Sequence, residues 1–514
     1  MKKHIIRNKK VRYAGISLLL TVAVLVVTVL ANVVVGSLVS RYGLYTSLVG
    51  PRSFDVSEDC FELLEGAFDQ ARAEGKEDDV KIIFCDTEKA VSDNAAVNYY
   101  LYHTVQELTS RFDNIKTEYV DIFTNPTDTL RGYTYSTHPL TGETIETPIG
   151  TNHVIVVCGD YHRVYTANDF YAFSNDEDPT SAWAYDGEKK ISAAILRAIE
   201  KETRVACILV NHGEALLDYE MMSLLSDAGY TVVTLDLYKE ELPKNCDLII
   251  SYNPKTDLVS DALSEKSETE LLDTFLKTSG RAFWVFLDKN TQRLPNFEKY
   301  LGEWGVATDY WTSNGVSYRH SVQDDTASLT SDGCTIYGTA AEGSTLASNA
   351  DFVVFRNATS LRVAPEGYWR DDNGGYKSAD GTRTMHPVYR SGDGAVSWAN
   401  GVAVADGATS LITVTEQKNG EGSSYVGVIS SVEFAKREYL QSAVYGNADV
   451  LMHLFGATGG PTTTEGLKLI PFVFYDISTI TTSQMLGWTL VLTIVPAAVI
   501  GVTALVVLLR RRRA

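Results

Sequence analysis

Four apolar runs, with helical stretches between them, decide the fold of this chain. The first run, RVACILVN, covers Arg204 to Asn211, and the amphipathic stretch Glu214 to Ala228 follows it. Runs of the same kind stand at 230–235 (YTVVTL), 246–251 (CDLIIS) and 282–287 (AFWVFL). Apolar runs of this length are typical of buried strands. Because strands and helices alternate, the sequence predicts a parallel sheet with right-handed crossovers.

A second α/β region precedes this one in the chain. Its predicted strands include Val80 to Cys85 and His153 to Cys158. Two late runs, 411–414 and 425–430, are expected to join the sheet of the later region, after a Gly- and Ser-rich stretch. We therefore expect an α/β domain over 40–203, a second α/β domain over 204–462 with a β-rich insert at about 320–405, and a stalk over 463–486.

Two charge-free segments, Ala14 to Val39 and Gly487 to Leu509, are each long enough to cross a bilayer as a helix. Basic residues flank their outer ends, in tails at 1–13 and 510–514, which predicts that both termini lie in the cytoplasm. A cleaved signal peptide is the alternative for the first segment. The expected fold class is thus a two-span α/β protein of the bacterial inner membrane, with the lipid bilayer as a partner and most of the chain extracytoplasmic.

The charge of the chain argues against nucleic acid as a partner. It has 65 acidic and 45 basic residues, a formal net charge of −20. Ten of the basic residues lie in the two terminal tails, so the region between them is more acidic still. Phosphates are repelled by such a surface.

Motifs of several common catalytic sites are absent from the sequence. The only Gly-Lys pair, Gly75-Lys76, lacks the earlier glycine of a phosphate-binding loop and is followed by Glu77. Neither a G-x-S-x-G elbow nor an H-E-x-x-H helix occurs. We therefore expect a non-enzymatic protein without a cofactor.

The cysteines and histidines give weak signals. None of the six cysteines forms a C-x-x-C pair, which favours buried free thiols, and a disulfide involving Cys60 or Cys334 is the alternative. His153, His162 and His212 would hold a metal only if the fold brought them together, and no metal site is predicted. Clusters of tyrosines, such as 99–102, indicate either half-buried packing or a glycan or peptide surface.

The candidate ligand-binding residues are Asn211, His212, Gly213 and Glu214, where the first strand of the second domain ends. Ligands of open parallel sheets bind beyond the carboxyl ends of the strands. A histidine and a glutamate there could hold a ligand or act as acid and base. The structural alternative is that Glu214 stabilises a helix start and Gly213 permits a tight turn.

The order of these elements resembles the GldG-like family, auxiliary components of ABC transporters associated with gliding motility. The segments that carry the resemblance are Arg41-Tyr42-Gly43, Lys189 to Glu214 (KKISAAILRAIEKETRVACILVNHGE), Ala228-Gly229-Tyr230, Leu235-Asp236-Leu237, Cys246 to Pro254, Gly446 to Asp449 ahead of Val450 to Phe455, and the terminal apolar segment with its arginines. Asn211 stands where the family usually has the first glycine of a Gly-His-Gly-Glu turn.

The resemblance implies a second domain similar to the flavodoxin-like, class I glutamine-amidotransferase fold without its catalytic cysteine. It also implies partners, the permease and ATPase subunits of an ABC system. The expected function is a non-enzymatic auxiliary subunit whose outer domain binds substrate, a partner protein, or a cell-wall or extracellular ligand. The alternatives are a membrane-anchored hydrolase that uses His212 and Glu214, and a wall-facing structural or sensor protein that works without a transporter.

Overall fold

The structure is a computed structural model, and it describes most of residues 55–472, together with Val502 and Leu509. Short gaps in the description fall at 94–95, 125–129, 138–143, 176–177, 202–203, 261–265, 364–366 and 372–373. The chain divides into two compact units, Met1–Asp55 and Val56–Ala514. Everything below concerns the second unit, in which we distinguish a first lobe (56–200) and a second lobe (204–469).

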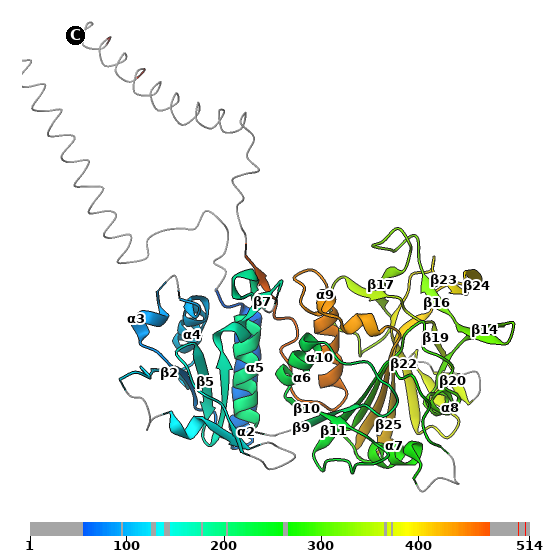
Figure 1. The fold of residues 1–514 in the computed structure, drawn as a ribbon, viewed down its shortest axis with the longest axis horizontal. Helices are drawn as coiled ribbons and strands as arrows, with labels where there is room; N and C mark the ends of the chain where they lie inside the picture. The colour runs from blue at the N-terminus through cyan, green and yellow to red at the C-terminus, as the bar shows by residue number, and fades with distance from the viewer. Residues whose placement is uncertain are drawn as a thin grey trace, which may run out of the picture. The chain divides into compact units, whose positions relative to one another are not determined.

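The first lobe is built on a four-stranded sheet with the order β2-β1-β5-β6 (Figure 1). β1 pairs with β2 in parallel, and the other two pairings are antiparallel. The elements of this lobe are α2 (Glu58–Ala73), β1 (Val80–Phe84), α3 (Glu88–Val91), α4 (Tyr99–Arg111), β2 (Ile115–Tyr119), β3 (Tyr135–Thr137), β4 (Thr144–Glu146), β5 (His153–Cys158), β6 (Tyr161–Thr166), β7 (Tyr171–Phe173), β8 (Ala182–Tyr185) and α5 (Gly187–Glu200). The predicted strands at 80–85 and 153–158 are confirmed, the first to within one residue.

The helices α2, α4 and α5 bury their apolar stripes in one core on the sheet. Leu64, Leu101 and Ile195, one from each helix, are fully buried in this core. The polar side of α2 stays outside, and its N-cap Ser57 accepts a hydrogen bond from the Cys60 backbone amide. Such amphipathic helices gain their stability from the apolar face they bury.

The second lobe contains a larger sheet and a series of β-hairpins. Its elements are β9 (Arg204–Leu209), α6 (Tyr219–Asp227), β10 (Tyr230–Leu235), β11 (Cys246–Tyr252), α7 (Glu268–Leu276), β12 (Ala282–Phe286), α8 (Pro295–Glu303), β13 (Val306–Thr308), β14 (Tyr310–Ser313), β15 (Val316–Arg319), β16 (Ser321–Gln323), β17 (Thr335–Ala340), β18 (Val353–Arg356), β19 (Leu361–Val363), β20 (Tyr368–Arg370), β21 (Tyr376–Ser378), β22 (Arg383–Arg390), β23 (Val396–Ala399), β24 (Val402–Asp406), β25 (Ser410–Asn419), β26 (Gly422–Ile429), α9 (Arg437–Leu440) and α10 (Asn447–Ala457).

The main path of this sheet runs β10-β9-β11-β12-β26-β25-β22-β17-β18. The five strands from β10 to β26 are parallel, and β25, β22, β17 and β18 continue it in antiparallel pairs. The parallel sheet of the second domain and its two late strands are therefore confirmed. The stretch 320–405 forms strands, as predicted, and several of them extend this same sheet.

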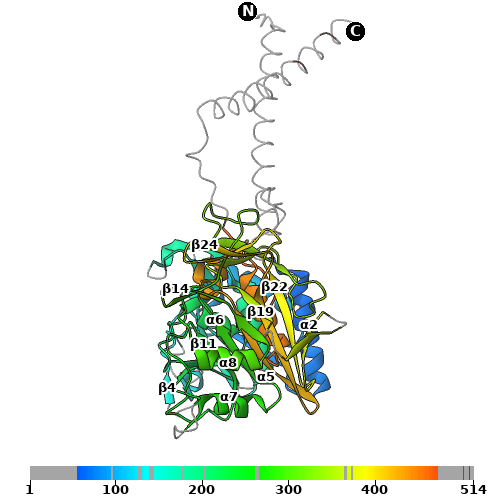
Figure 2. The ribbon, with the colours of Figure 1, turned by 90° about the vertical axis from the view of Figure 1, so that its right-hand side faces the viewer.

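Helices cover both faces of the parallel part. The residues of β9 alternate between two cores, with Val205 facing α7 and α8 and Ala206 facing α6 and α10. Figure 2 shows α7 and α8 stacked on the near face of the lobe. A sheet buried on both faces needs nearly continuous apolar strands, which explains why the runs at 204–211 and 282–287 are so marked.

Replacing Gly427 with alanine tests how closely the centre of this sheet is packed. Gly427 in β26 lies directly opposite Trp284 of β12, and an added Cβ would overlap the fully buried indole ring. We expect the substitution to lower the free energy of unfolding by about 1–3 kcal/mol, measured by urea denaturation. Gly66, on α2 with open space around it, is the control, and its change to alanine should stabilise the chain by roughly 0.5–1 kcal/mol. Equal stability of the Gly427 variant and the unmodified chain would contradict the packing.

No helix among the described residues is long and apolar enough to cross a membrane. A bilayer span needs roughly 20 apolar residues, whereas α2, the longest helix of the described part, has 16 residues and carries charges. This finding corrects the predicted fold class: the described chain is a mixed α/β protein with large β-sheets. The same finding contradicts the transmembrane assignment and the two-pass location in the inner membrane. The segments 14–39 and 487–509 lie outside the described residues, except for Val502 and Leu509.

The last described strand returns to the first lobe. β27 (Ile470–Pro471) pairs with β8, which also pairs with β7, so two strands of the first lobe and the last described strand form one small sheet. Residues 463–472 are the only described part of the predicted stalk. Within them, Thr464 is fully buried and Leu467 joins the core of the first lobe.

Candidate functional site

The order of the parallel strands places a crevice at the ends of β9 and β11. The chain enters the sheet at β9, runs outward to β10, and then crosses back to β11 on the other side of β9. The loops that follow β9 and β11 therefore leave the sheet in opposite directions, which is the usual ligand position in open α/β sheets. Asn211 to Glu214 lie in the first of these loops, where the sequence placed the candidate site.

The two loops meet at His212. The backbone amides of Lys255 and Thr256, which follow β11, donate to the His212 carbonyl at 2.8 and 2.9 Å. Gly213 has φ +68°, and an added Cβ would lie 3.3 Å from the Lys255 Cβ. The glycine thus serves a tight turn against the neighbouring loop, as the structural alternative predicted.

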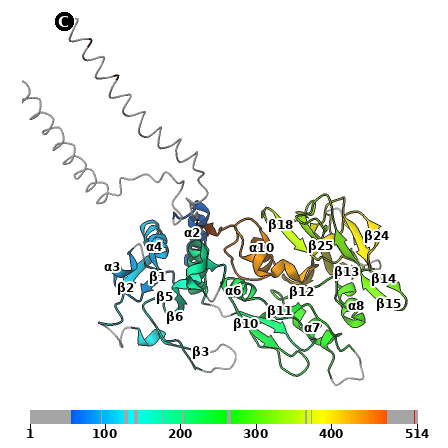
Figure 3. The ribbon, with the colours of Figure 1, turned by 45° about the horizontal axis from the view of Figure 1, so that its top comes forward.

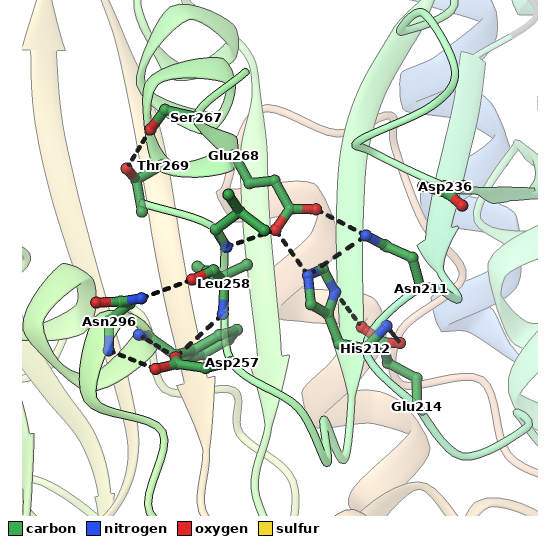
Figure 4. Close-up of polar contacts among 12 residues, drawn as sticks. Asn211, His212, Glu214, Asp236, Asp257, Leu258, Ser267, Glu268, Thr269 and Asn296 are labelled. Atoms are coloured by element: carbon green, nitrogen blue, oxygen red, sulfur yellow. Dashed lines mark hydrogen bonds and ion pairs between the residues drawn. The ribbon is translucent and has the colours of Figure 1, made fainter. Parts of the chain in front are cut away.

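Two carboxylates hold the His212 ring, one at each nitrogen (Figure 4). Nδ1 lies 3.1 Å from Glu214 Oε1, and Nε2 lies 2.9 Å from Glu268 Oε2. Both carboxylates also accept backbone amides, Glu214 from His212 and Glu268 from Val259. Asn211 donates to the remaining Glu268 oxygen at 2.7 Å. We call His212, Glu214, Glu268 and Asn211 the His212 cluster.

The His212 cluster is buried and charged. The side chain of His212 is 3% exposed, that of Glu214 1% and that of Glu268 0%. Burial by itself lowers the pKa of His212, but the hydrogen bonds that its ring donates to Glu214 and Glu268 outweigh this effect and raise the pKa to about 9. Burial likewise favours the neutral form of Glu268, yet its bond to His212 leaves its pKa below the ordinary value. The ring is therefore an imidazolium at neutral pH.

This arrangement does not suit acid–base catalysis. A general base needs a free ring nitrogen within reach of the substrate, and both nitrogens of His212 are occupied by carboxylates. Burial also keeps the ring from any ligand in the two cavities described below, since His212 lines neither of them. Glu214 does not begin a helix either, because α6 starts only at Tyr219; its carboxylate holds the histidine instead.

The other histidines proposed as partners of His212 have neighbours of their own. His153 Nδ1 accepts the Gly150 amide at 2.9 Å, and the His162 ring packs edge-on against Tyr133. No group of three or more His, Cys, Asp or Glu side chains in the described part of the chain could hold a metal ion. All six cysteines are free thiols and five are buried, so no disulfide joins Cys60 or Cys334.

Two cavities, absent from our sequence predictions, lie between the lobes. The smaller has a volume of about 780 Å³ and lies at the carboxyl edge of the sheet, lined by Tyr252 at the end of β11, by Asn253 directly after it, and by Trp183 of the first lobe. The larger, of about 1240 Å³, is lined by residues of β6, α5, α6 and α10. Figure 1 shows these three helices next to one another, and Figure 3 shows α6 and α10 from a second direction. We call the two cavities together the interlobe cleft.

Polar contacts hold the walls of the interlobe cleft together. Lys190 of α5 donates to Ser223 Oγ of α6 at 2.7 Å and forms an ion pair with Asp227. Arg437 of α9 donates to the backbone carbonyl of Phe173 in β7. The side chains of Lys190 and Asp227 are only 15% and 12% exposed, so this pair joins α5 to α6 largely out of contact with solvent.

Comparisons of the chain with models of protein families, with curated proteins and with solved structures found no match.

Proposed function

We propose that this chain is a non-enzymatic binding subunit that works beside the permease and ATPase of an ABC transport system. It takes its ligand or protein partner in the interlobe cleft. One observation favours binding over catalysis. The His212 cluster fills the crevice at the ends of β9 and β11, whereas the two cavities of the interlobe cleft have volumes of about 780 and 1240 Å³. Pockets of at least this size accept small organic ligands.

The transport system enters the proposal through the GldG-like resemblance of segments such as Lys189 to Glu214. The described fold is consistent with it, because that segment forms α5, β9 and the turn that carries His212. The hydrolase alternative has lost its basis, since His212 and Glu214 hold each other in a buried pair. The missing phosphate-binding loop means that ATP hydrolysis would be supplied by the partner ATPase.

Co-purification tests the transport role. The tagged full-length chain is expressed in the organism that encodes it and purified from gently solubilised extracts. An ABC ATPase and a multi-span permease should co-purify with it, and mass spectrometry identifies both. A tagged acidic protein of similar size and charge serves as the control bait, because a net charge of −20 attracts basic proteins unspecifically. Repeated recovery of the chain without either subunit would contradict the role.

A further inference from the structure

The charged and hydroxyl groups that line the smaller cavity all have partners within the protein. The five charged residues of the lining form the ion pairs Asp218–Lys436, Glu220–Arg437, Glu433–Arg356 and Glu438–Arg356. Ser174 Oγ donates a hydrogen bond to the Ser181 carbonyl at 3.2 Å. The Tyr252 hydroxyl donates to the Val432 carbonyl at 2.6 Å. A ligand is therefore not needed to neutralise any charge of this lining.

Three neutral N–H donors of the same lining have no hydrogen-bond partner among the described residues. They belong to the Trp183 indole of β8, to the Asn253 amide directly after β11, and to the Gln441 amide directly after α9. All three side chains are partly exposed, and solvent reaches their nitrogens. A ligand in the smaller cavity can therefore reach these donors.

Neighbouring groups fix which end of each amide is the donor. Lys255 Nζ donates to Asn253 Oδ1 at 2.6 Å, and Thr291 Oγ1 donates to the same oxygen at 3.2 Å. Arg437 donates to Gln441 Oε1 at 3.2 and 3.3 Å. Ammonium and guanidinium groups carry donors only, so the amide atom that faces them must be the oxygen. The NH₂ ends of both amides are thus left for a ligand.

We propose that the smaller cavity binds a neutral ligand that presents carbonyl oxygens, the backbone of an uncharged peptide, with Trp183, Asn253 and Gln441 as the hydrogen-bond donors. The cavity lies at the carboxyl edge of the parallel strands, the usual ligand position in such sheets. A ligand must replace the water on each N–H with an acceptor of its own. This inference rests on the proposed binding role of the interlobe cleft and names its ligand class.

The lining disfavours charged ligands of either sign. An organic cation brings only further N–H donors, which cannot pair with the three that are present. An anion meets a lining with three carboxylates and two basic side chains. A peptide backbone carries one neutral carbonyl oxygen per residue, so it can accept from donors that belong to three different elements.

Fluorine NMR of the full-length chain labelled with 5-fluorotryptophan tests the proposal. Of the seven tryptophans, only Trp183 lines either cavity, and its signal is identified by its loss in Trp183→Phe. The probes are acetyl-tetraalanine amide, a neutral peptide, succinate, whose acceptors are charged, and butylguanidinium, which has donors only. We expect the peptide to shift the Trp183 signal saturably and the two controls to leave it in place. The absence of a shift with the peptide, or an equal shift with either control, would overturn the proposal.

Two variants test the amide donors by isothermal titration with the same peptide. Asn253→Asp and Gln441→Glu each replace an NH₂ donor with a carboxylate oxygen of similar shape, and each should weaken peptide binding about fivefold. Asn253 has φ +57°, a backbone conformation that aspartate also tolerates, so we expect Asn253→Asp to fold. The matched control is Gln70→Glu, at an exposed position on α2, which should leave the affinity unchanged. Unchanged affinity in both cavity variants, with or without a lowered melting temperature, would refute the roles of Asn253 and Gln441.

The two proposals can fail separately. The fluorine spectra and the titration use the isolated chain and report only on the ligand, whereas co-purification reports only on the transporter subunits. Peptide binding by a chain that never recovers a permease would retain the site and reject the transport role. A recovered permease with no peptide binding would do the reverse.

Discussion

The substitution His212→Ala is expected to lower the free energy of unfolding by about 3–5 kcal/mol, the usual cost of removing one partner from a buried ion pair. It would leave Glu214 and Glu268, 1% and 0% exposed, without the cation between them. Urea denaturation of the full-length chain measures the effect. Tryptophan fluorescence can follow the transition, because Trp284 and Trp304 are fully buried in the second lobe.

His453 offers a matched control for this prediction. Its Nδ1 also binds a carboxylate, Glu465 at 2.7 Å, but the two side chains are 24% and 39% exposed. A pair of this kind contributes about 0–1 kcal/mol, so His453→Ala should have a small effect. If both variants lost the same small amount of stability, the account of His212 as a buried, doubly paired cation would be wrong.

The stability of the chain should fall between about pH 6.5 and pH 9 because of His212. Its pKa is about 9 in the folded chain and 6.5 in an unperturbed histidine. The folded state therefore binds the proton more tightly than the unfolded state, and the stabilisation is complete below pH 6.5 and lost as the pH rises through 9. The full difference corresponds to roughly 3 kcal/mol.

Urea midpoints at several pH values in this range provide the measurement. The glutamine in the variant His212→Gln cannot gain a proton. The stability of this variant should therefore change little with pH in this range, whereas that of the unmodified chain should fall. Higher pH is avoided because burial raises the pKa of Cys60 and Cys85 to about 12, which adds a further alkaline destabilisation. An identical slope in the variant and the unmodified chain would show that another group titrates.

Much of the second lobe could be predicted from the sequence because its central strands are buried on both faces. The run at 230–235 coincides with β10, and those at 204–211, 246–251 and 282–287 differ from their strands by at most two residues. The start of α6 was predicted five residues too early. The sequence pattern allowed a helix from Glu214, but the carboxylate of that residue is used by His212, a contact that hydrophobic periodicity does not reveal.

The part of the candidate site that is local in sequence could be predicted, whereas the contacts between distant residues could not. The position of Asn211 to Glu214 at a strand end followed from the local pattern, and the structure places them at the crevice. Glu268 did not follow, because it lies 56 residues from His212 in the chain and belongs to a different element, the helix α7. The interlobe cleft did not follow either, because its two cavities are lined by residues of both lobes that lie far apart in the chain.

The pairing of β27 with β8 has a consequence for folding during synthesis. A ribosome makes residues 204–469 before it makes Ile470 and Pro471, so the small sheet of the first lobe must wait for its third strand. The second lobe is, in topological terms, an insertion within the first, and it can complete its sheet while the first lobe is still unfinished. Because domains generally fold as units in the order of their emergence, a stalled chain that ends shortly before residue 470 should protect β9–β12 from proteolysis and leave β7 and β8 susceptible.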